Sequence, residues 1–167
     1  MKKTLISTAA LSVVALALVV TMLIVNSSAF AVHANTDNDI FIHVVEHAIT
    51  DTVGDRDNGK PSPDALGNVL AFHNPVFDAA NKKQVGHDNG DCVRTVTGKN
   101  GAWECFWTVF LDGGQITVEG PYYTNGTDSI LAITGGTDSY NLARGQMKLH
   151  ARNAKGTAYD FIYEIEP

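Results

Sequence analysis

Residues 114–122 read GQITVEGPY, residues 131–140 read LAITGGTDSY and residues 143–146 read ARGQ. Apolar side chains alternate with polar ones in these segments, and glycine turns separate them. This pattern is typical of consecutive antiparallel β-strands joined by hairpins. Outside the first 34 residues, no segment shows helical periodicity over more than two turns. The three segments therefore predict an all-β fold.

The same alternation, followed outward in both directions, predicts eight strands. They are expected at residues 40–48, 68–77, 91–96, 102–111, 115–119, 129–134, 142–151 and 157–165. Eight short antiparallel strands can close a barrel whose interior holds side chains or one small ligand. We expect an eight-stranded antiparallel β-barrel, with a β-sandwich as the alternative. Residues 51–67 mix glycine and proline with charges, which predicts a long exposed loop.

The first 34 residues have the pattern of a secretory signal peptide. Lys2 and Lys3 precede a long, mostly apolar run, and small residues end it at Ala29 and Ala31. An uncleaved membrane anchor is the alternative, since the run is long enough to span a bilayer. Cleavage after Ala31 or Ala34 would leave residues 35–167 as one secreted or extracytoplasmic domain without a membrane contact.

Charge argues against one class of partner. Loss of the leader removes two lysines and no acid, so the formal net charge changes from −6 to −8. An acidic domain binds nucleic acid poorly. The remaining chain of roughly 130 residues is enough for a single core.

The two cysteines, Cys92 and Cys105, flank a turn at residues 97–101. A four-residue hairpin loop at 97–100 would place Arg94 opposite Trp103 and Cys92 opposite Cys105, within disulfide reach. An exported domain permits oxidation, which favours a structural disulfide. A free Cys92 thiol with a functional role is the alternative.

A longer resemblance runs through the middle of the chain. Residues 67–78 (GNVLAFHNPVFD), 82–86 (KKQVG) and 90–93 (GDCV) resemble plant allene oxide cyclases in order and spacing, as do the glycine-rich segments. The resemblance covers residues 44–150, and dirigent proteins are relatives of that superfamily. It implies a small β-barrel with an apolar pocket for a hydrophobic molecule, and no cofactor.

The resemblance also implies a set of pocket residues. The family's pocket glutamate, asparagine, cysteine, tyrosine and loop proline match Glu46, Asn74, Cys92, Tyr122 and Pro63. Glu46 would act as a charge-stabilising carboxylate on an otherwise apolar face, while Asn74 and Tyr122 orient water or a ligand oxygen. Pro63 and Cys92 would contact the substrate.

Phe72 and Val118 are expected to line the apolar wall, which would fold the substrate for ring closure. Ala48 replaces a second polar residue that the plant enzymes carry two positions after the glutamate. Plant relatives assemble as trimers, and Phe41 and Val45 face outward, so a homo-oligomer, trimer or dimer, is plausible.

Several alternatives stay open at this point. Glu46 could be paired with an arginine such as Arg94 inside the barrel. His43 and His47 share one strand face but lie roughly 13 Å apart along it, too far to share a metal ion. We therefore predict a cyclase or isomerase without metal. The alternatives are a non-catalytic dirigent-like or lipocalin-like binding protein, and a structural envelope protein with a filled barrel.

Overall fold

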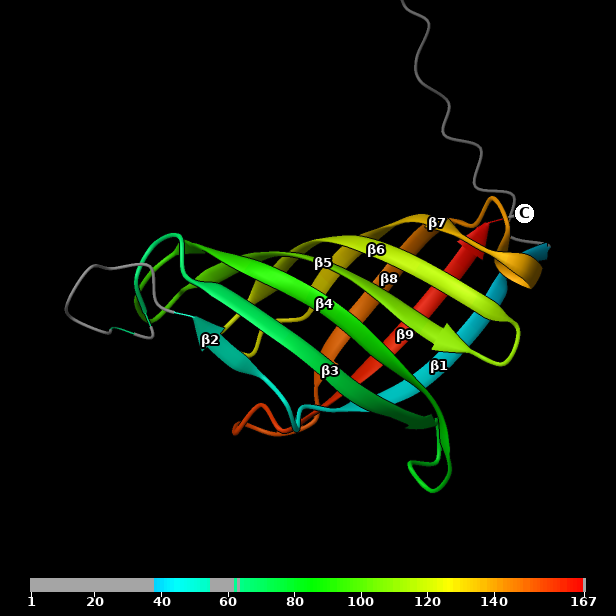
Figure 1. Ribbon diagram of the computed structural model, residues 1–167, viewed down its shortest axis with the longest axis horizontal. Coiled ribbons are helices and arrows are strands. Elements are labelled where there is room, and N and C mark those ends of the chain that lie inside the picture. Colours follow the sequence, from blue (N-terminus) through cyan, green and yellow to red (C-terminus); the bar gives the residue numbers. More distant parts are fainter. Residues whose placement is uncertain (1–37, 55–61, 63, 167) are drawn as a thin grey trace, which may run out of the picture. The chain divides into compact units, whose positions relative to one another are not determined.

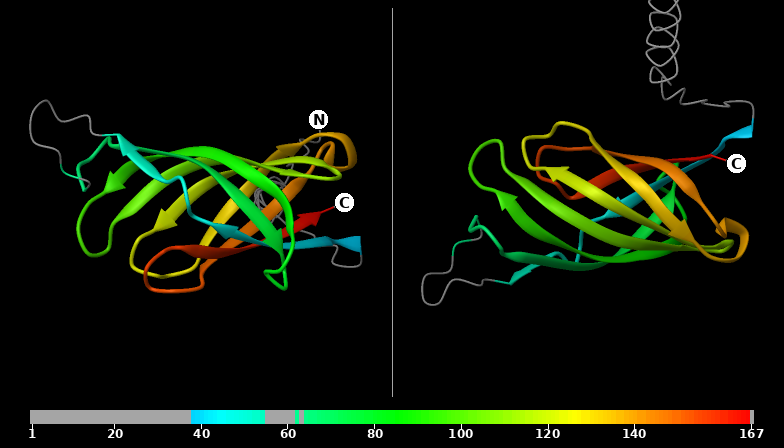
Figure 2. Two further views of the ribbon diagram at one scale, coloured as in Figure 1. Left: turned by 60° about the horizontal axis from the view of Figure 1, so that its bottom comes forward. Right: turned by 90° about the horizontal axis from the view of Figure 1, so that it is seen from above.

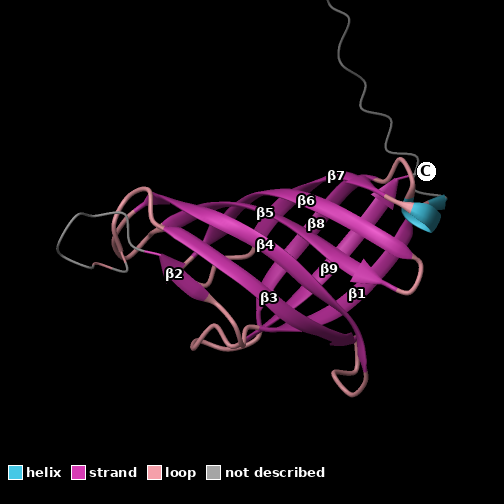
Figure 3. Ribbon diagram, viewed as in Figure 1, coloured by secondary structure: helices cyan, strands magenta, loops and turns pink. Residues whose placement is uncertain are grey.

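The structure is a computed structural model that describes residues 38–54, 62 and 64–166. The predicted signal peptide and Pro63 lie outside these residues. The described part consists of strands, turns and a short 3₁₀ helix, η2 (Asp138–Tyr140) (Figures 1 and 3). Its strands are β1 Ile40–His47, β2 Thr52–Gly54, β3 Val69–Asp78, β4 Gln84–Val96, β5 Ala102–Leu111, β6 Gly114–Tyr123, β7 Ser129–Gly136, β8 Arg144–Ala151 and β9 Ala158–Glu166. None of its helical segments has the length and hydropathy of a membrane span.

The strands form one antiparallel sheet in the order β1-β9-β8-β7-β6-β5-β4-β3-β2. A further pairing of β1 with β3 closes the sheet on itself, so that β2 is an extra strand beside β3. Figure 1 shows the barrel from the side and Figure 2 shows it from two other directions. The predicted eight-stranded antiparallel barrel is confirmed. The β-sandwich alternative is wrong, because the strands form one closed sheet rather than two packed ones.

β4 is longer than predicted, since it begins at Gln84 rather than at residue 91. Its first half contains Gly86, Asn89 and Gly90, and these residue types are depleted in strands. Gly90 is needed where it stands, because a Cβ atom there would lie 2.6 Å from the Phe106 carbonyl oxygen. The extra residues bring Asp88 onto the inward face of the strand, where it is fully buried.

Two further segments differ from the sequence-based expectation. The loop predicted for residues 51–67 contains β2, which pairs with β3. β6 continues past the predicted end at residue 119, because Gly120 and Pro121 stay paired with Cys105 and Glu104 of β5. Tyr122 therefore lies on a strand and points inward rather than following a turn.

The disulfide between Cys92 and Cys105 ties β4 to β5 across the barrel wall. The two residues face each other in the ladder, as do Arg94 and Trp103, so this part of the predicted register is confirmed. Val96 pairs with Ala102 rather than with Gly101, because the ladder shifts between Arg94 and Val96. The alternative of a free Cys92 thiol is wrong, since both cysteines are in the bridge.

Candidate functional site

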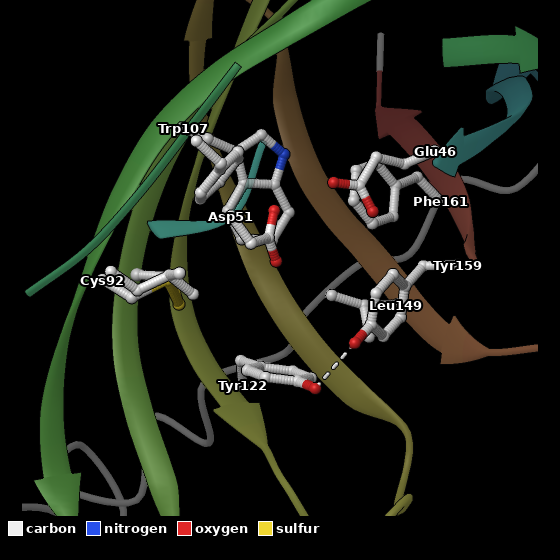
Figure 4. A pocket seen from close by; sticks show the side chains of 11 residues that line it. Glu46, Asp51, Cys92, Trp107, Tyr122, Leu149, Tyr159 and Phe161 are labelled. Atoms are coloured by element: carbon white, nitrogen blue, oxygen red, sulfur yellow. Dashed lines mark hydrogen bonds between the residues drawn. A yellow bond between two sulfur atoms is a disulfide. The ribbon is translucent and has the colours of Figure 1, made fainter. Parts of the chain in front are cut away.

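A cavity lies inside the barrel, between the strands rather than on the outer surface (Figure 4). It measures about 40 Å³, taken as the space that the centre of a water molecule can occupy. Its lining is Glu46, Asp51, Leu70, Phe72, Cys92, Cys105, Trp107, Tyr122, Leu149, Tyr159 and Phe161. Most of this lining is apolar or aromatic, which is typical of small-molecule pockets.

Asn74 of β3 organises the polar side of the cavity. Its side-chain Nδ2 donates to Oε1 of Glu46 at 2.6 Å and to Oδ1 of Asp51 at 2.7 Å. Its Oδ1 accepts from the backbone N–H groups of Ile49 and Thr50, both at 2.9 Å. Asn74 is fully buried and both ends of its amide are used. It therefore fixes the chain after β1 against β3 and positions two carboxyl groups.

Glu46 of β1 is buried on the wall of the cavity. Burial raises its pKa well above the usual value, and the charge of nearby Asp88 raises the pKa further. The hydrogen bond from Asn74 opposes this shift, and Asp51 adds to it. Glu46 therefore keeps its proton to a higher pH than an exposed glutamate does. When Glu46 is protonated, Oε2 is the oxygen available to carry the proton, because Oε1 accepts the Asn74 bond.

Asp88 of β4 is a second buried carboxyl group close to Glu46. Its Oδ1 accepts from the backbone N–H of Asn74 at 3.2 Å, while Oδ2 has no partner among the described residues. Burial raises the pKa of Asp88 to about 7, against the lowering effect of the Asn74 bond. Glu46 and Asp88 lie close enough for the charge of one to raise the pKa of the other, so the two acids titrate as a pair.

Tyr122 of β6 and Tyr159 of β9 form a second polar group of the cavity, beside Glu46, because Tyr159 is paired with Glu46 between β9 and β1. Their hydroxyl groups share a hydrogen bond of 2.8 Å, drawn as the dashed line in Figure 4, and their rings meet edge to face at 5.8 Å. Burial raises the pKa of both phenols, so both stay protonated at neutral pH. The pair offers one free hydroxyl hydrogen toward a ligand oxygen.

Aromatic rings form much of the remaining wall. Trp107 meets Phe161 with ring centroids 5.3 Å apart and Phe72 with centroids 6.1 Å apart. These rigid side chains limit the shapes that a ligand can adopt and present π faces to it.

Most of the residues predicted from the sequence meet at this cavity. Glu46, Phe72, Cys92 and Tyr122 line it. Asn74 is not among the lining residues, but it donates a hydrogen bond to Glu46, which is. Val118 is fully buried in the core and is not among the lining residues. Pro63 lies outside the described residues.

The alternative of a Glu46–Arg94 ion pair is wrong. The Nη2 atom of Arg94 pairs with Oδ1 of Asp64, and its guanidinium lies over the ring of Trp103 at 5.0 Å. Glu46 instead has an asparagine and two other acids around it. Glu46 pairs with Val76 of β3, and Val76 pairs with Gly86 of β4, eight residues before Arg94.

Sequence reasoning missed three polar members of the site. Asp51 looked like a loop residue, yet it follows β1 closely and reaches Asn74. Asp88 was outside the predicted strand, although it shares its inward face with Cys92 at a spacing of four residues. Tyr159 was assigned to a strand without a role. Alternation along β4 and β9 could have found both strand residues.

The exposed histidines of β1 have other partners. His43 contacts Asp160 at 2.7 Å and His47 contacts Asn81 at 2.8 Å. Within residues 38–54, 62 and 64–166, no three His, Cys, Asp or Glu side chains are arranged to hold a metal ion.

Comparison with known proteins relates this barrel to a family. The sequence model of a family described as allene oxide cyclase matches residues 43–155. A solved structure of a pyocyanin demethylase is similar, with 26% identity, a TM-score of 0.61, and coverage of 74% of this chain and 100% of that one.

Two further structures share the fold. One is a pterocarpan synthase dirigent protein, with 18% identity, a TM-score of 0.62, and coverage of 77% of this chain and 94% of that one. The other is a Diels–Alderase from Streptomyces koyangensis, with 12% identity, a TM-score of 0.56, and coverage of 100% and 84% respectively. The barrel therefore occurs in proteins of several different activities.

Proposed function

The chain belongs to the allene oxide cyclase family, and from this premise we propose that it is a cofactor-free cyclase or isomerase of a hydrophobic small molecule. The observation that carries the proposal is the buried Glu46 acid on the wall of a largely apolar, aromatic cavity. A carboxyl group with a raised pKa in a cavity is a common mark of acid–base chemistry.

The raised pKa of Glu46 supports a different protonation state from the one expected from the sequence. A neutral acid donates its proton, or a strong hydrogen bond, to an oxygen that gains negative charge. In the opening of an allene oxide, the epoxide C–O bond breaks and its electron pair goes to oxygen. Glu46 Oε2–H stabilises that oxygen.

The aromatic wall stabilises the positive charge of the transition state. As the C–O bond breaks, positive charge develops on carbon, and the faces of Trp107 and Phe72 attract a cation within about 6 Å. Ring closure then forms one C–C bond and removes both charges, so the product is an isomer. The proton of Glu46 is retained, and the reaction needs no oxidant, reductant or cofactor.

Asp88 and Asn74 act behind Glu46 in this scheme. Asp88 keeps the proton on Glu46 through its charge, and Asn74 orients the carboxyl group through Oε1. The Tyr122–Tyr159 pair lies beside Glu46, because Tyr159 is the partner of Glu46 in the β1–β9 ladder, and it binds a second ligand oxygen or a water molecule. The acid and the hydroxyl donors together would orient the polar part of the bound molecule.

The small cavity restricts the mode of binding. Its volume of about 40 Å³ accommodates the reacting part of a ligand, since pockets that enclose whole drug-sized ligands measure roughly 300–1,000 Å³. The rest of a long substrate has to extend beyond the cavity. A cavity that encloses only the reacting carbons would hold the two ends of a short segment together, as a cyclisation requires.

A chiral product assay tests the proposal. Mature protein, residues 35–167, is mixed with an unstable fatty-acid allene oxide generated in place, beside Glu46→Gln. Gln keeps the Oε1 acceptor for Asn74 but has no acid proton, so the fold is retained and the enantiomeric excess disappears. Glu119→Gln, on the outer face of β6, is the matched control and keeps full excess.

A racemic product identical to the buffer control, from the wild-type protein, would overturn allene oxide cyclisation. The second candidate function is then a non-catalytic barrel that binds a hydrophobic molecule or intermediate, as the apolar wall favours. Both tryptophans of the chain, Trp103 and Trp107, are buried inside the barrel. A binder would give a saturable change in their fluorescence without product.

We also propose an extracytoplasmic location. The Cys92–Cys105 bridge suits an oxidising compartment, where disulfides persist, and the leader has the pattern of an export signal. Mass spectrometry of the protein from culture supernatant or periplasm tests this location. We expect an N-terminus at Val32 or Asn35 and an intact disulfide bridge.

A further inference from the structure

Arg94 is a buried cation near the end of β4, beside the β4–β5 turn, and the proposed function gives it no role. Arg94 is 6% exposed to solvent. It lies on the inward face of β4, two positions beyond Cys92, which lines the cavity. Across the sheet, Arg94 faces Trp103, and Trp103 faces Tyr122 of the cavity wall. Arg94 therefore lies one inward position beyond Cys92, toward the β4–β5 turn.

The partner of this buried cation comes from the surface. Nη2 of Arg94 pairs with Oδ1 of Asp64, whose side chain is 47% exposed. The other carboxylate oxygen, Oδ2, accepts from the backbone N–H of Gly98 at 2.8 Å. These bonds from Gly98 and Arg94 hold the pKa of Asp64 below its usual range, so the carboxylate is ionised. An exposed side chain thus neutralises an internal charge.

The pairing leaves the guanidinium incompletely used. Nε of Arg94 is buried and has no hydrogen-bond partner among the described residues. A buried donor without an acceptor is costly, and a carboxylate that meets two guanidinium N–H groups at once binds more strongly than one held by a single bond. In the structure Asp64 meets the guanidinium through one oxygen, and its other oxygen accepts from Gly98.

The surroundings of Arg94 are also set by the backbone. Gly101, in the β4–β5 turn, has no side chain, and a Cβ atom there would overlap Nη2. The guanidinium lies over Trp103 at 5.0 Å, which adds a cation–π contact. The segment before β3 is attached to the Arg94 backbone independently of the ion pair, through Gly67 N–H to Arg94 O at 2.9 Å and Arg94 N–H to Asn68 O at 2.8 Å. Asp64 can therefore leave without detaching that segment.

We propose that Arg94 binds the carboxylate head group of an amphipathic ligand whose apolar part enters the cavity, and that Asp64 occupies this subsite when no ligand is bound. The inference rests on the proposed function, because the cavity encloses only part of a long ligand and the rest extends toward Arg94. Exchange of Asp64 for the ligand carboxylate keeps the internal charge neutralised throughout. It also gives Nε an acceptor.

Binding of a fluorescent polyene fatty acid, parinaric acid, and of its methyl ester tests the subsite by energy transfer from the buried tryptophans. In the wild-type protein the acid binds about tenfold more tightly than the ester. Asp64→Asn removes the internal competitor, so it tightens acid binding by about a further tenfold and leaves ester binding unchanged. Asp112→Asn makes the same charge change in the β5–β6 turn at the other end of the barrel and alters neither affinity.

Arg94→Gln abolishes the difference between acid and ester, and Arg94→Lys keeps part of it through charge alone. Circular dichroism confirms that each variant is folded. Since Asp64→Asn leaves Arg94 in place, it decides the question even where an Arg94 variant unfolds. Equal binding of acid and ester by the wild-type protein and by Asp64→Asn overturns the subsite but leaves the apolar pocket intact. Failure of both probes to bind overturns the pocket as well.

Discussion

The strands β1, β3 and β4 turn carboxyl and amide groups into the barrel, whereas β5 to β8 turn mainly apolar side chains inward. On the first side, Glu46, Asn74 and Asp88 are all buried. On the second, the fully buried side chains include Val109, Ile116, Val118, Leu131 and Met147. The difference teaches how each side holds together. Apolar side chains contribute through the area that each removes from water, but the polar groups depend on one another.

The apolar side is expected to show the largest single effect. Leu131→Ala removes a fully buried side chain of β7 and leaves a cavity, which lowers the free energy of unfolding by about 4 kcal/mol. Urea denaturation at pH 5 and pH 8 measures the loss, which should be equal at the two values. Leu142→Ala, at an exposed residue, is the control and should cost less than about 0.5 kcal/mol. A loss that depends on pH would show that the two sides are not separate.

The polar side should respond to loss of its organising residue. Asn74→Ala leaves the N–H groups of Ile49 and Thr50 without their acceptor and Glu46 without its donor, so we expect a loss of about 3 kcal/mol. Asn89→Ala removes an exposed asparagine from the same pair of strands and serves as the control in the same urea titration. If both substitutions cost the same, Asn74 would not be the centre of a network.

A smaller effect should be a dependence of stability on pH, which we expect from the polar side alone. The folded-state pKa of Asp88, about 7, lies above its ordinary value of 3.8. The folded protein therefore holds more protons than the unfolded chain between about pH 4 and pH 7. The contribution of Asp88 to the free energy of unfolding is fully present below this window. It falls as pH rises through the window, by at most about 1.4 kcal/mol per pH unit for one group.

Asp88→Asn should flatten this decline, and Glu46→Gln should flatten it in part, because both amides stay neutral. Thermal unfolding in a series of buffers from pH 4 to pH 8 measures the slope. Asp112→Asn, in the exposed β5–β6 turn, should leave the slope unchanged. A wild-type protein that gains stability from pH 4 to pH 7 would contradict the raised pKa of Asp88.

The two sides also differ in how far the sequence could predict them. The apolar strands β5 to β8 follow one another through hairpins, so alternation and turn residues were enough to locate them. The resemblance to a family added Glu46, Asn74 and Tyr122. Asp88 stayed hidden, because its strand begins with glycines and asparagine and its role depends on β3 lying beside β4. The pairing of Arg94 with Asp64 was equally out of reach, since it joins a strand to a loop 30 residues away.

The seam between β1 and β3 has a consequence for the order of folding. β1 pairs with β3 through only three positions, Val44–Asp78, Val45–Phe77 and Glu46–Val76. Strands β3 to β9 are each paired with their neighbour in sequence, and such local contacts form early. β1 instead pairs with β9 and β3, so we expect it to join last and close the barrel. Because Glu46 lies at this closing seam, the acid would reach its buried surroundings only in the final step, and the candidate site would be incomplete until then.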